Sequence, residues 1–204
     1  MAYLELEKNK FDCTQCHTRC DGKSKLNYQF KNDVIFAEKQ EQLIIDHINN
    51  LTHFKAEKSK NDGYPDIEIY NSDGSLRSYL EIKAQRRTFM TVKERLPKAD
   101  LVPSETLALN LSDLLRYFEI EADKKVPISI LWVVTDRPCI VSENKSIFYH
   151  QKCSELQSIY NRYRSKRKFR RQTGKGDVVD GKHKGVVVNY HFSINELKIW
   201  NTDI

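Results

Sequence analysis

The chain of 204 residues lacks an apolar run of the length that a membrane-spanning helix needs, which is about 18 residues. Its first residues, Met-Ala-Tyr-Leu-Glu-Leu-Glu-Lys, lack the pattern of a secretory signal peptide. Neither an internal repeat nor a low-complexity tract is present. These absences argue against a membrane protein and against a repeat array, and we expect a cytoplasmic protein with no membrane partner.

The composition indicates a globular protein. Aromatic residues make up 10% of it, which argues against disorder although charged residues reach 30%. The length suffices for one well-buried domain with a small appendage. We therefore expect an N-terminal arm over residues 1–32 and one α/β domain over residues 33–204.

Two short segments, 66–70 and 79–85, alternate polar and apolar residues as half-buried strands do. Between them, Asp73-Gly74 is typical of a two-residue hairpin turn. With that turn, residues that face each other across the hairpin have numbers that sum to 147, as 66 and 81 do. The pattern predicts that Asp66 lies opposite Glu81, with side chains about 5 Å apart at their Cβ atoms.

The same alternation places Lys83 and Gln85 on the face of Glu81, while Leu80, Ile82 and Ala84 point to the core. Two opposed carboxylates repel each other unless a positive charge lies between them. Mg²⁺ (or Mn²⁺) suits such a site, because it takes oxygen ligands and is completed by water and substrate phosphate.

Pro65-Asp66 followed by Glu81-Ile82-Lys83 resembles the motif of the PD-(D/E)xK nuclease superfamily. The resemblance covers about residues 33–137 and implies a restriction-endonuclease-like αβββαβ core, with a mixed central sheet flanked by helices. It further implies metal-dependent hydrolysis of DNA, in which Lys83 orients a water molecule or stabilises charge on the phosphate. Gln85 would support the same face.

The family usually carries an acidic residue on a helix before the first strand. Residues 33–51 show helical spacing of apolar side chains, with Asp33 as a plausible N-cap. Glu41 interrupts the apolar face at the spacing of Ile44 and Ile48, whereas Glu38 lies one turn earlier. We favour Glu41 as the third Mg²⁺ ligand beside Asp66 and Glu81, and Glu38 stays the alternative.

The net charge of +6 is concentrated in one segment, because residues 162–171 hold seven cations and no acid. Such a segment suits contact with a phosphate backbone, and its two aromatic residues would stack on bases or anchor it to the domain. The predicted DNA-binding residues are Arg162, Arg164, Lys166, Arg167, Lys168, Arg170 and Arg171.

Three of the five cysteines, Cys13, Cys16 and Cys20, fall within eight residues near the N-terminus. In a reducing compartment this spacing favours a structural Zn²⁺ site, which needs four ligands. The fourth ligand would be Cys153, Cys139 or His17, and an iron–sulfur cluster is the alternative to zinc.

Further elements follow from the pattern. Residues 105–121 read as an apolar segment leading to a helix with Ser112 as N-cap, and 128–135 as a buried strand. Residues 151–168 read as a helix, 186–192 as a strand, and Ser193 to Glu196 as a capping box.

Together these observations predict a Mg²⁺-dependent DNA endonuclease with no small-molecule substrate. The resemblance favours restriction-type cleavage of double-stranded DNA by a homodimer. A repair, junction-resolving or mobile-element nuclease is the alternative with the same fold, and the chemistry leaves RNA and single-stranded substrates open as alternatives to double-stranded DNA. A DNA-binding module without activity and a zinc-stapled protein-interaction domain are alternatives of other classes.

Overall fold

A computed structural model describes residues 30–86, 88–135, 137, 139–141, 145–170, 178–179, 182–183 and 188–200. The helices are α1 (Phe30–Leu51), α2 (Val92–Arg95), α3 (Leu111–Lys124) and α4 (Cys153–Tyr163), with 3-10 turns η3 (Pro103–Glu105), η4 (Arg164–Arg167) and η6 (Ile194–Glu196). The strands are β1 (Lys55–Lys58), β2 (Ile67–Tyr70), β3 (Leu76–Gln85), β4 (Thr106–Asn110), β5 (Ile128–Val134), β6 (Ile147–Lys152), β7 (Lys168–Arg170), β8 (Val178–Val179), β9 (Lys182–His183), β10 (Val188–Ser193) and β11 (Lys198–Ile199).

The largest sheet has the strand order β1-β2-β3-β5-β6-β11. Strands β3 and β5 pair in parallel, and the other pairs are antiparallel. A parallel pair needs a crossover, and α3 lies in this one. The predicted mixed α/β architecture is confirmed. The elements α1, β1, β2, β3, α3 and β5 occur in the expected order, with α2, η3 and β4 inserted between β3 and α3.

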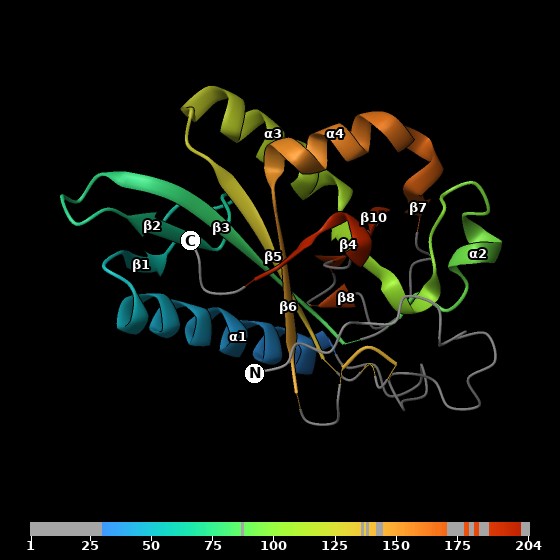
Figure 1. Ribbon diagram of the computed structural model, residues 1–204, viewed down its shortest axis with the longest axis horizontal. Coiled ribbons are helices and arrows are strands. Elements are labelled where there is room, and N and C mark those ends of the chain that lie inside the picture. Colours follow the sequence, from blue (N-terminus) through green and yellow to red (C-terminus); the bar gives the residue numbers. More distant parts are fainter. Residues whose placement is uncertain are drawn as a thin grey trace.

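Helices cover both faces of the large sheet (Figure 1), with α1 on one face and α3 and α4 on the other. One core cluster joins Ile44 and Ile48 of α1 to Ile67, Ile82 and Leu131 of the sheet. A larger cluster packs α3 and α4 against the opposite face. The continuous apolar run of β5 is therefore buried on both sides, as its sequence predicts.

Strand β3 differs from the half-buried strand that its alternation predicts. Tyr79, Leu80, Glu81 and Ile82 are all buried, because α3 covers the face expected to be open. Glu81 on that face therefore lies inside the protein, where unpaired charge is costly, whereas Lys83 and Gln85 are partly exposed.

The hairpin between β2 and β3 reaches the predicted register by another route. Its loop has three residues, because Asn71 N–H bonds to Ser75 O at 2.9 Å and Gly74 adopts a positive φ of 82°. The partners Tyr70 and Leu76 have numbers that sum to 146. A β-bulge then adds one residue to β3, so that Ile67 pairs with Leu80 and the sum becomes 147.

Two predicted helix starts are wrong. Helix α1 begins at Phe30, so Asp33 lies within it and is no N-cap. The cap of α3 is Asn110, whose side-chain oxygen accepts from the backbone N–H of Ser112. The predicted capping box from Ser193 to Glu196 is confirmed.

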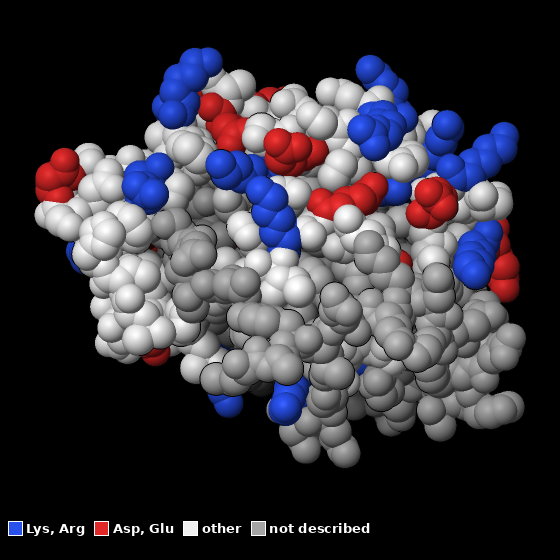
Figure 2. Space-filling view, in the orientation of Figure 1, with Lys and Arg blue, Asp and Glu red and all other residues white. Residues whose placement is uncertain are grey.

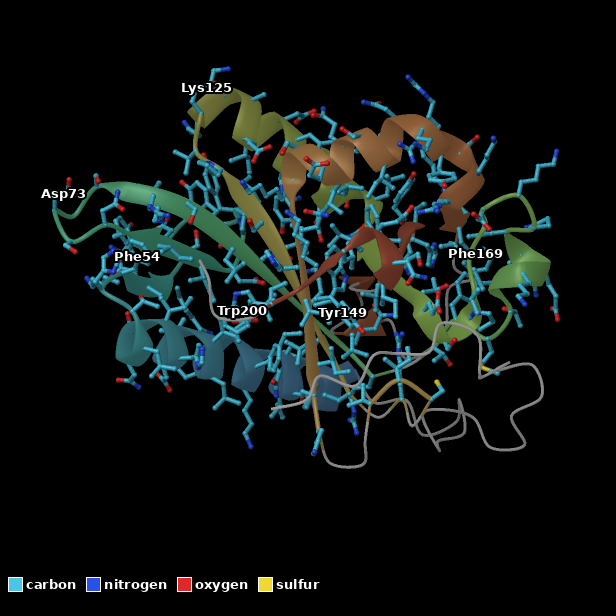
Figure 3. The ribbon with its side chains drawn as sticks, in the orientation of Figure 1. Phe54, Asp73, Lys125, Tyr149, Phe169 and Trp200 are labelled. Carbon is cyan, nitrogen blue, oxygen red and sulfur yellow. The ribbon has the colours of Figure 1, made fainter. Side chains whose placement is uncertain are left out.

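A smaller sheet of order β4-β10-β7 lies beside the large one. The predicted helix 151–168 is shorter, because α4 ends at Tyr163 and the chain continues through η4 into β7. Phe169 of β7, labelled in Figure 3, packs against Phe89 with ring centroids 5.0 Å apart and ring planes tilted by 50°, which attaches the segment before α2. No helix in the described part of the chain has the length and apolar character required to cross a membrane.

Candidate active site

Asp66 and Glu81 meet where β2 begins alongside the middle of β3. Asp66 directly precedes β2, and its Oδ2 accepts the backbone N–H of Ile82 at 2.8 Å. Since Ile67 pairs with Leu80, the next pair outward along the hairpin is Asp66 with Glu81. The structure thus brings the two predicted carboxylates to the same place on the sheet.

Glu81 is held from two sides although it is only 2% exposed. Its Oε1 forms an ion pair with the Lys83 ammonium, which lies two residues along β3 on the same face. Its Oε2 accepts a hydrogen bond of 2.6 Å from the hydroxyl of Tyr117, a buried residue of α3. Both oxygens of the buried carboxylate therefore have a donor.

The close approach of these charges alters how they titrate. Burial, followed by repulsion from Glu81, raises the pKa of Asp66 from 3.8 to about 7. Burial opposes the charge on Lys83, but attraction from Glu81 and Asp66 outweighs it and raises the pKa of the ammonium. Burial and the adjacent Glu81 also raise the pKa of Tyr117, so its hydroxyl stays a donor. A cation bound nearby would offset this repulsion and favour the ionised form of Asp66.

Glu41 approaches the site from α1 but is engaged elsewhere. Its carboxylate forms an ion pair with Lys58 of β1 at 3.2 Å, and its side chain is 17% exposed. Its charge still contributes to the raised pKa of Asp66, although less than burial and Glu81 do. Glu38 is exposed on the same helix. Of the two candidates, Glu41 is the one whose charge reaches Asp66.

The predicted three-carboxylate metal site is not assembled in this conformation. Among the described residues, no three Asp, Glu, His or Cys side chains group as the ligands of one metal ion. Asp66 and Glu81 alone fit Mg²⁺, which often takes one or two carboxylates and completes its shell with water and phosphate oxygens. Glu41 would have to exchange Lys58 for the metal.

Gln85 has a structural use in the fold. Its amide oxygen accepts the backbone N–H of Ala108 at 2.9 Å, and its Nε2 lies 3.4 Å from the carbonyl of Thr106. These contacts tie the end of β3 to β4. Gln85 would therefore support the catalytic face, as predicted, by holding the end of β3 against β4.

Sequence reasoning missed the contribution of α3. Besides Tyr117, Arg116 donates to the carbonyl of Gly63 at 2.6 Å and to Asp113 at 2.7 Å. Gly63 lies in the loop that leads into Asp66, and its φ of 80° favours glycine. Tyr117 and Glu81 are 36 residues apart, so only the packing of α3 on β3 reveals the contact. The helical periodicity of 111–124 was the available signal.

The basic segment divides into surface and core residues. Arg162, Arg164, Lys166 and Arg170 are exposed, and Lys168 is partly exposed. Figure 2 shows cationic side chains projecting over α4 and towards α2. Arg171 lies outside the described residues.

Arg167 is a correction to the predicted DNA-binding set. It is 1% exposed, donates to Glu196 at 2.6 Å and to the carbonyl of Ala99 at 3.0 Å, and lies over the ring of Tyr163. Phe169 anchors the segment, because it packs into the cluster around α2.

The predicted zinc or iron–sulfur ligands Cys13, Cys16, Cys20 and His17 lie outside the described residues. Cys153 is described and is fully buried in the larger core cluster. Burial, with a smaller contribution from Glu121, raises the pKa of its thiol. The other three cysteine ligands lie outside the described residues, so Cys153 stays a prediction as the fourth ligand. Cys139 is partly exposed.

The chain shows little similarity to known proteins. No family model and no curated protein matches the chain. A solved structure described as Hjc of Archaeoglobus fulgidus, a Holliday junction resolvase from an archaeal hyperthermophile, matches with 10% identity over 79% of this chain and 84% of that one. Its TM-score of 0.37 is too low to show a shared fold. Function therefore has to be inferred from the site itself.

Proposed function

We propose that the protein is a metal-dependent nuclease of the PD-(D/E)xK kind that hydrolyses phosphodiester bonds of DNA. The observation that carries the proposal is the placement of Asp66, a partly buried carboxylate, beside the buried carboxylate of Glu81 and its ion pair with Lys83. Burying charge costs several kcal/mol for each ion, and well-packed apolar residues often stabilise a protein better. A network that raises the pKa of Asp66 to about 7 is therefore expected to have a use other than stability.

In this proposal Asp66 and Glu81 hold Mg²⁺, and Glu41 joins them when it releases Lys58. The bound ion would supply positive charge to the scissile phosphate and acidify a water molecule. Lys83 stands beside Glu81 with its side chain 30% exposed, so its ammonium can reach substrate. Its charge would stabilise the negative charge that develops on the phosphate.

DNA is proposed as the substrate because of the cationic surface. Arg162, Arg164, Lys166 and Arg170 are exposed around the end of α4 and β7. Neutralising phosphates with such side chains releases counterions, so affinity should fall with salt. Cutting both strands with one site per chain favours the homodimer, and light scattering in solution tests it.

The test is cleavage of supercoiled plasmid in the presence of Mg²⁺. Wild-type protein is expected to nick or linearise the plasmid, and Glu81→Gln is expected to lose about 100-fold or more of the rate. Glu68→Gln is a matched control, because Glu68 is also buried on this sheet but bonds to the Tyr70 hydroxyl at 2.6 Å. If wild type and Glu81→Gln both failed to cleave DNA and RNA, the proposed nuclease activity would be rejected.

Substrate choice then distinguishes the forms of the proposal. Restriction-type cleavage of double-stranded DNA predicts discrete fragments from a long linear substrate. A repair, junction-resolving or mobile-element nuclease predicts preference for damaged or branched DNA. A module that only binds DNA would show salt-dependent affinity and no cleavage at any Mg²⁺ concentration.

A further inference from the structure

The hydroxyl of Tyr117 lies at a fixed point beside Glu81. The tyrosine is 2% exposed, and its ring belongs to the core cluster that packs α3 on the sheet with Leu114 and Ile130. Because a close-packed ring has little freedom, the position of its oxygen is set by the core. The hydrogen bond of 2.6 Å to Glu81 Oε2 is therefore a rigid one.

The two groups that donate to Glu81 contact different oxygens of its carboxylate. Lys83 takes Oε1, and Tyr117 takes Oε2. Each carboxylate oxygen has two acceptor positions, so each retains one for a metal ion. A donor on both oxygens fixes the rotation of the carboxylate plane, which sets where the free acceptor positions point.

The two donors differ in stiffness. Lys83 carries its ammonium on a flexible four-carbon stem and is partly exposed. Tyr117 has a short, rigid side chain anchored on another element, so it can hold Glu81 while Lys83 moves to a substrate. Outer partners of this kind orient metal ligands and tune their affinity.

We propose that Tyr117 is the positioning residue of the active site, which orients the Glu81 carboxylate for the metal ion. The proposal rests on the nuclease function proposed above. It assigns to α3 a role in metal binding, in addition to packing on the sheet. Its consequence is that loss of one hydroxyl, with no loss of a charged group, should weaken the metal site.

The experiment compares Tyr117→Phe with Tyr190→Phe in the full chain. Both tyrosines are buried in the same core cluster, but the Tyr190 hydroxyl has no hydrogen-bond partner among the described residues. The two changes therefore remove the same atom from similar surroundings. Mg²⁺ alone is titrated by calorimetry, and kcat and KM are measured on plasmid DNA over a range of Mg²⁺ concentrations.

We expect Tyr117→Phe to bind Mg²⁺ about 10- to 100-fold more weakly than wild type. Its kcat at low Mg²⁺ should fall by a similar factor and recover in part at high Mg²⁺, while KM for DNA stays unchanged. Tyr190→Phe should match wild type in both measurements. A purely structural role for Tyr117 would lower the melting temperature without this dependence on Mg²⁺.

Equal Mg²⁺ affinity in the two variants, with wild type active and Glu81→Gln inactive, would overturn the role of Tyr117 and leave the nuclease standing. A wild type that neither binds Mg²⁺ nor cuts nucleic acid would overturn both. If Tyr117→Phe fails to fold, Tyr117→Met takes its place, because methionine also lacks the donor and its flexible side chain can fill the core. Weaker Mg²⁺ binding in that variant supports the proposal, and unchanged affinity contradicts it.

Discussion

Replacing Asp66 by Asn should stabilise the metal-free protein while it destroys the metal site. The Asp66 carboxylate accepts the Ile82 N–H and lies close to Glu81, and these surroundings raise its pKa from 3.8 to about 7. An amide oxygen can accept the same hydrogen bond without a charge. The substitution therefore removes a repulsion and keeps the contact.

The size of the effect follows from the two pKa values. They differ by about 3 pH units, and each unit corresponds to about 1.4 kcal/mol, so the ionised carboxylate costs up to about 4 kcal/mol. Since Asp66 is only partly buried and solvent screens part of this, we expect about 2 kcal/mol. Because the folded-state pKa is the higher one, the stabilisation by the proton is complete below about pH 4 and is lost as the pH rises to about 7.

Urea unfolding in EDTA at pH 5 and pH 8 measures this. The advantage of Asp66→Asn over wild type should grow by about 1 kcal/mol between the two pH values, because part of the total effect is already present at pH 5. Added Mg²⁺ at pH 8 should stabilise wild type and leave the variant unchanged. Asp62→Asn, at an exposed position four residues earlier, controls for a general charge effect. An advantage that is equal at both pH values, or a less stable variant at pH 8, would refute the reasoning.

Four further predictions concern the predicted site and the basic segment. Lys83→Met should slow plasmid cleavage by about 100-fold or more while a gel-shift assay still detects DNA binding, and loss of binding alone would contradict its role. Glu41→Gln should weaken Mg²⁺-dependent cleavage about tenfold and Glu38→Gln should not, so equal losses would remove the distinction. Arg167→Ala should lower the free energy of unfolding in urea by about 3 kcal/mol. Arg164→Ala should instead reduce the slope of log K against log salt by about 1, and an unchanged slope would exclude it from the DNA contact.

The hairpin illustrates both the reach and the limit of sequence reasoning. The expected two-residue turn at Asp73-Gly74 is wrong, because the loop has three residues. The pairing of Ile67 with Leu80 is nevertheless the one that the turn implied, since a bulge near Arg77 adds the missing residue. The side chains of a strand alternate between faces, so a shift of one residue would have moved Glu81 away from Asp66. Burial of one face constrains the register more strongly than the turn does.

The sequence does not predict contacts between elements that lie far apart in the chain. The alternation of β3 correctly places Glu81 and Lys83 on one face, but it does not reveal that α3 covers that face and brings Tyr117 to Glu81. Local charge density likewise assigned Arg167 to the surface. Its burial depends on Glu196, 29 residues later, which supplies the opposite charge. The periodicity of a sequence shows which side of a helix or strand is apolar. It does not show which other element packs against that side, because that depends on the whole fold.

The bulge also separates the tip of the hairpin from the carboxylates. Arg77 lies over the ring of Phe54 at 4.4 Å, and Asp73 stands at the far end of the hairpin, away from the helices (Figure 3). A change in loop length at residues 72–74 would be absorbed before the pairing of Ile69 with Ser78, where the register of the site begins. The tip is therefore a suitable place to graft a tag, a fluorophore or a second DNA-binding module onto this protein.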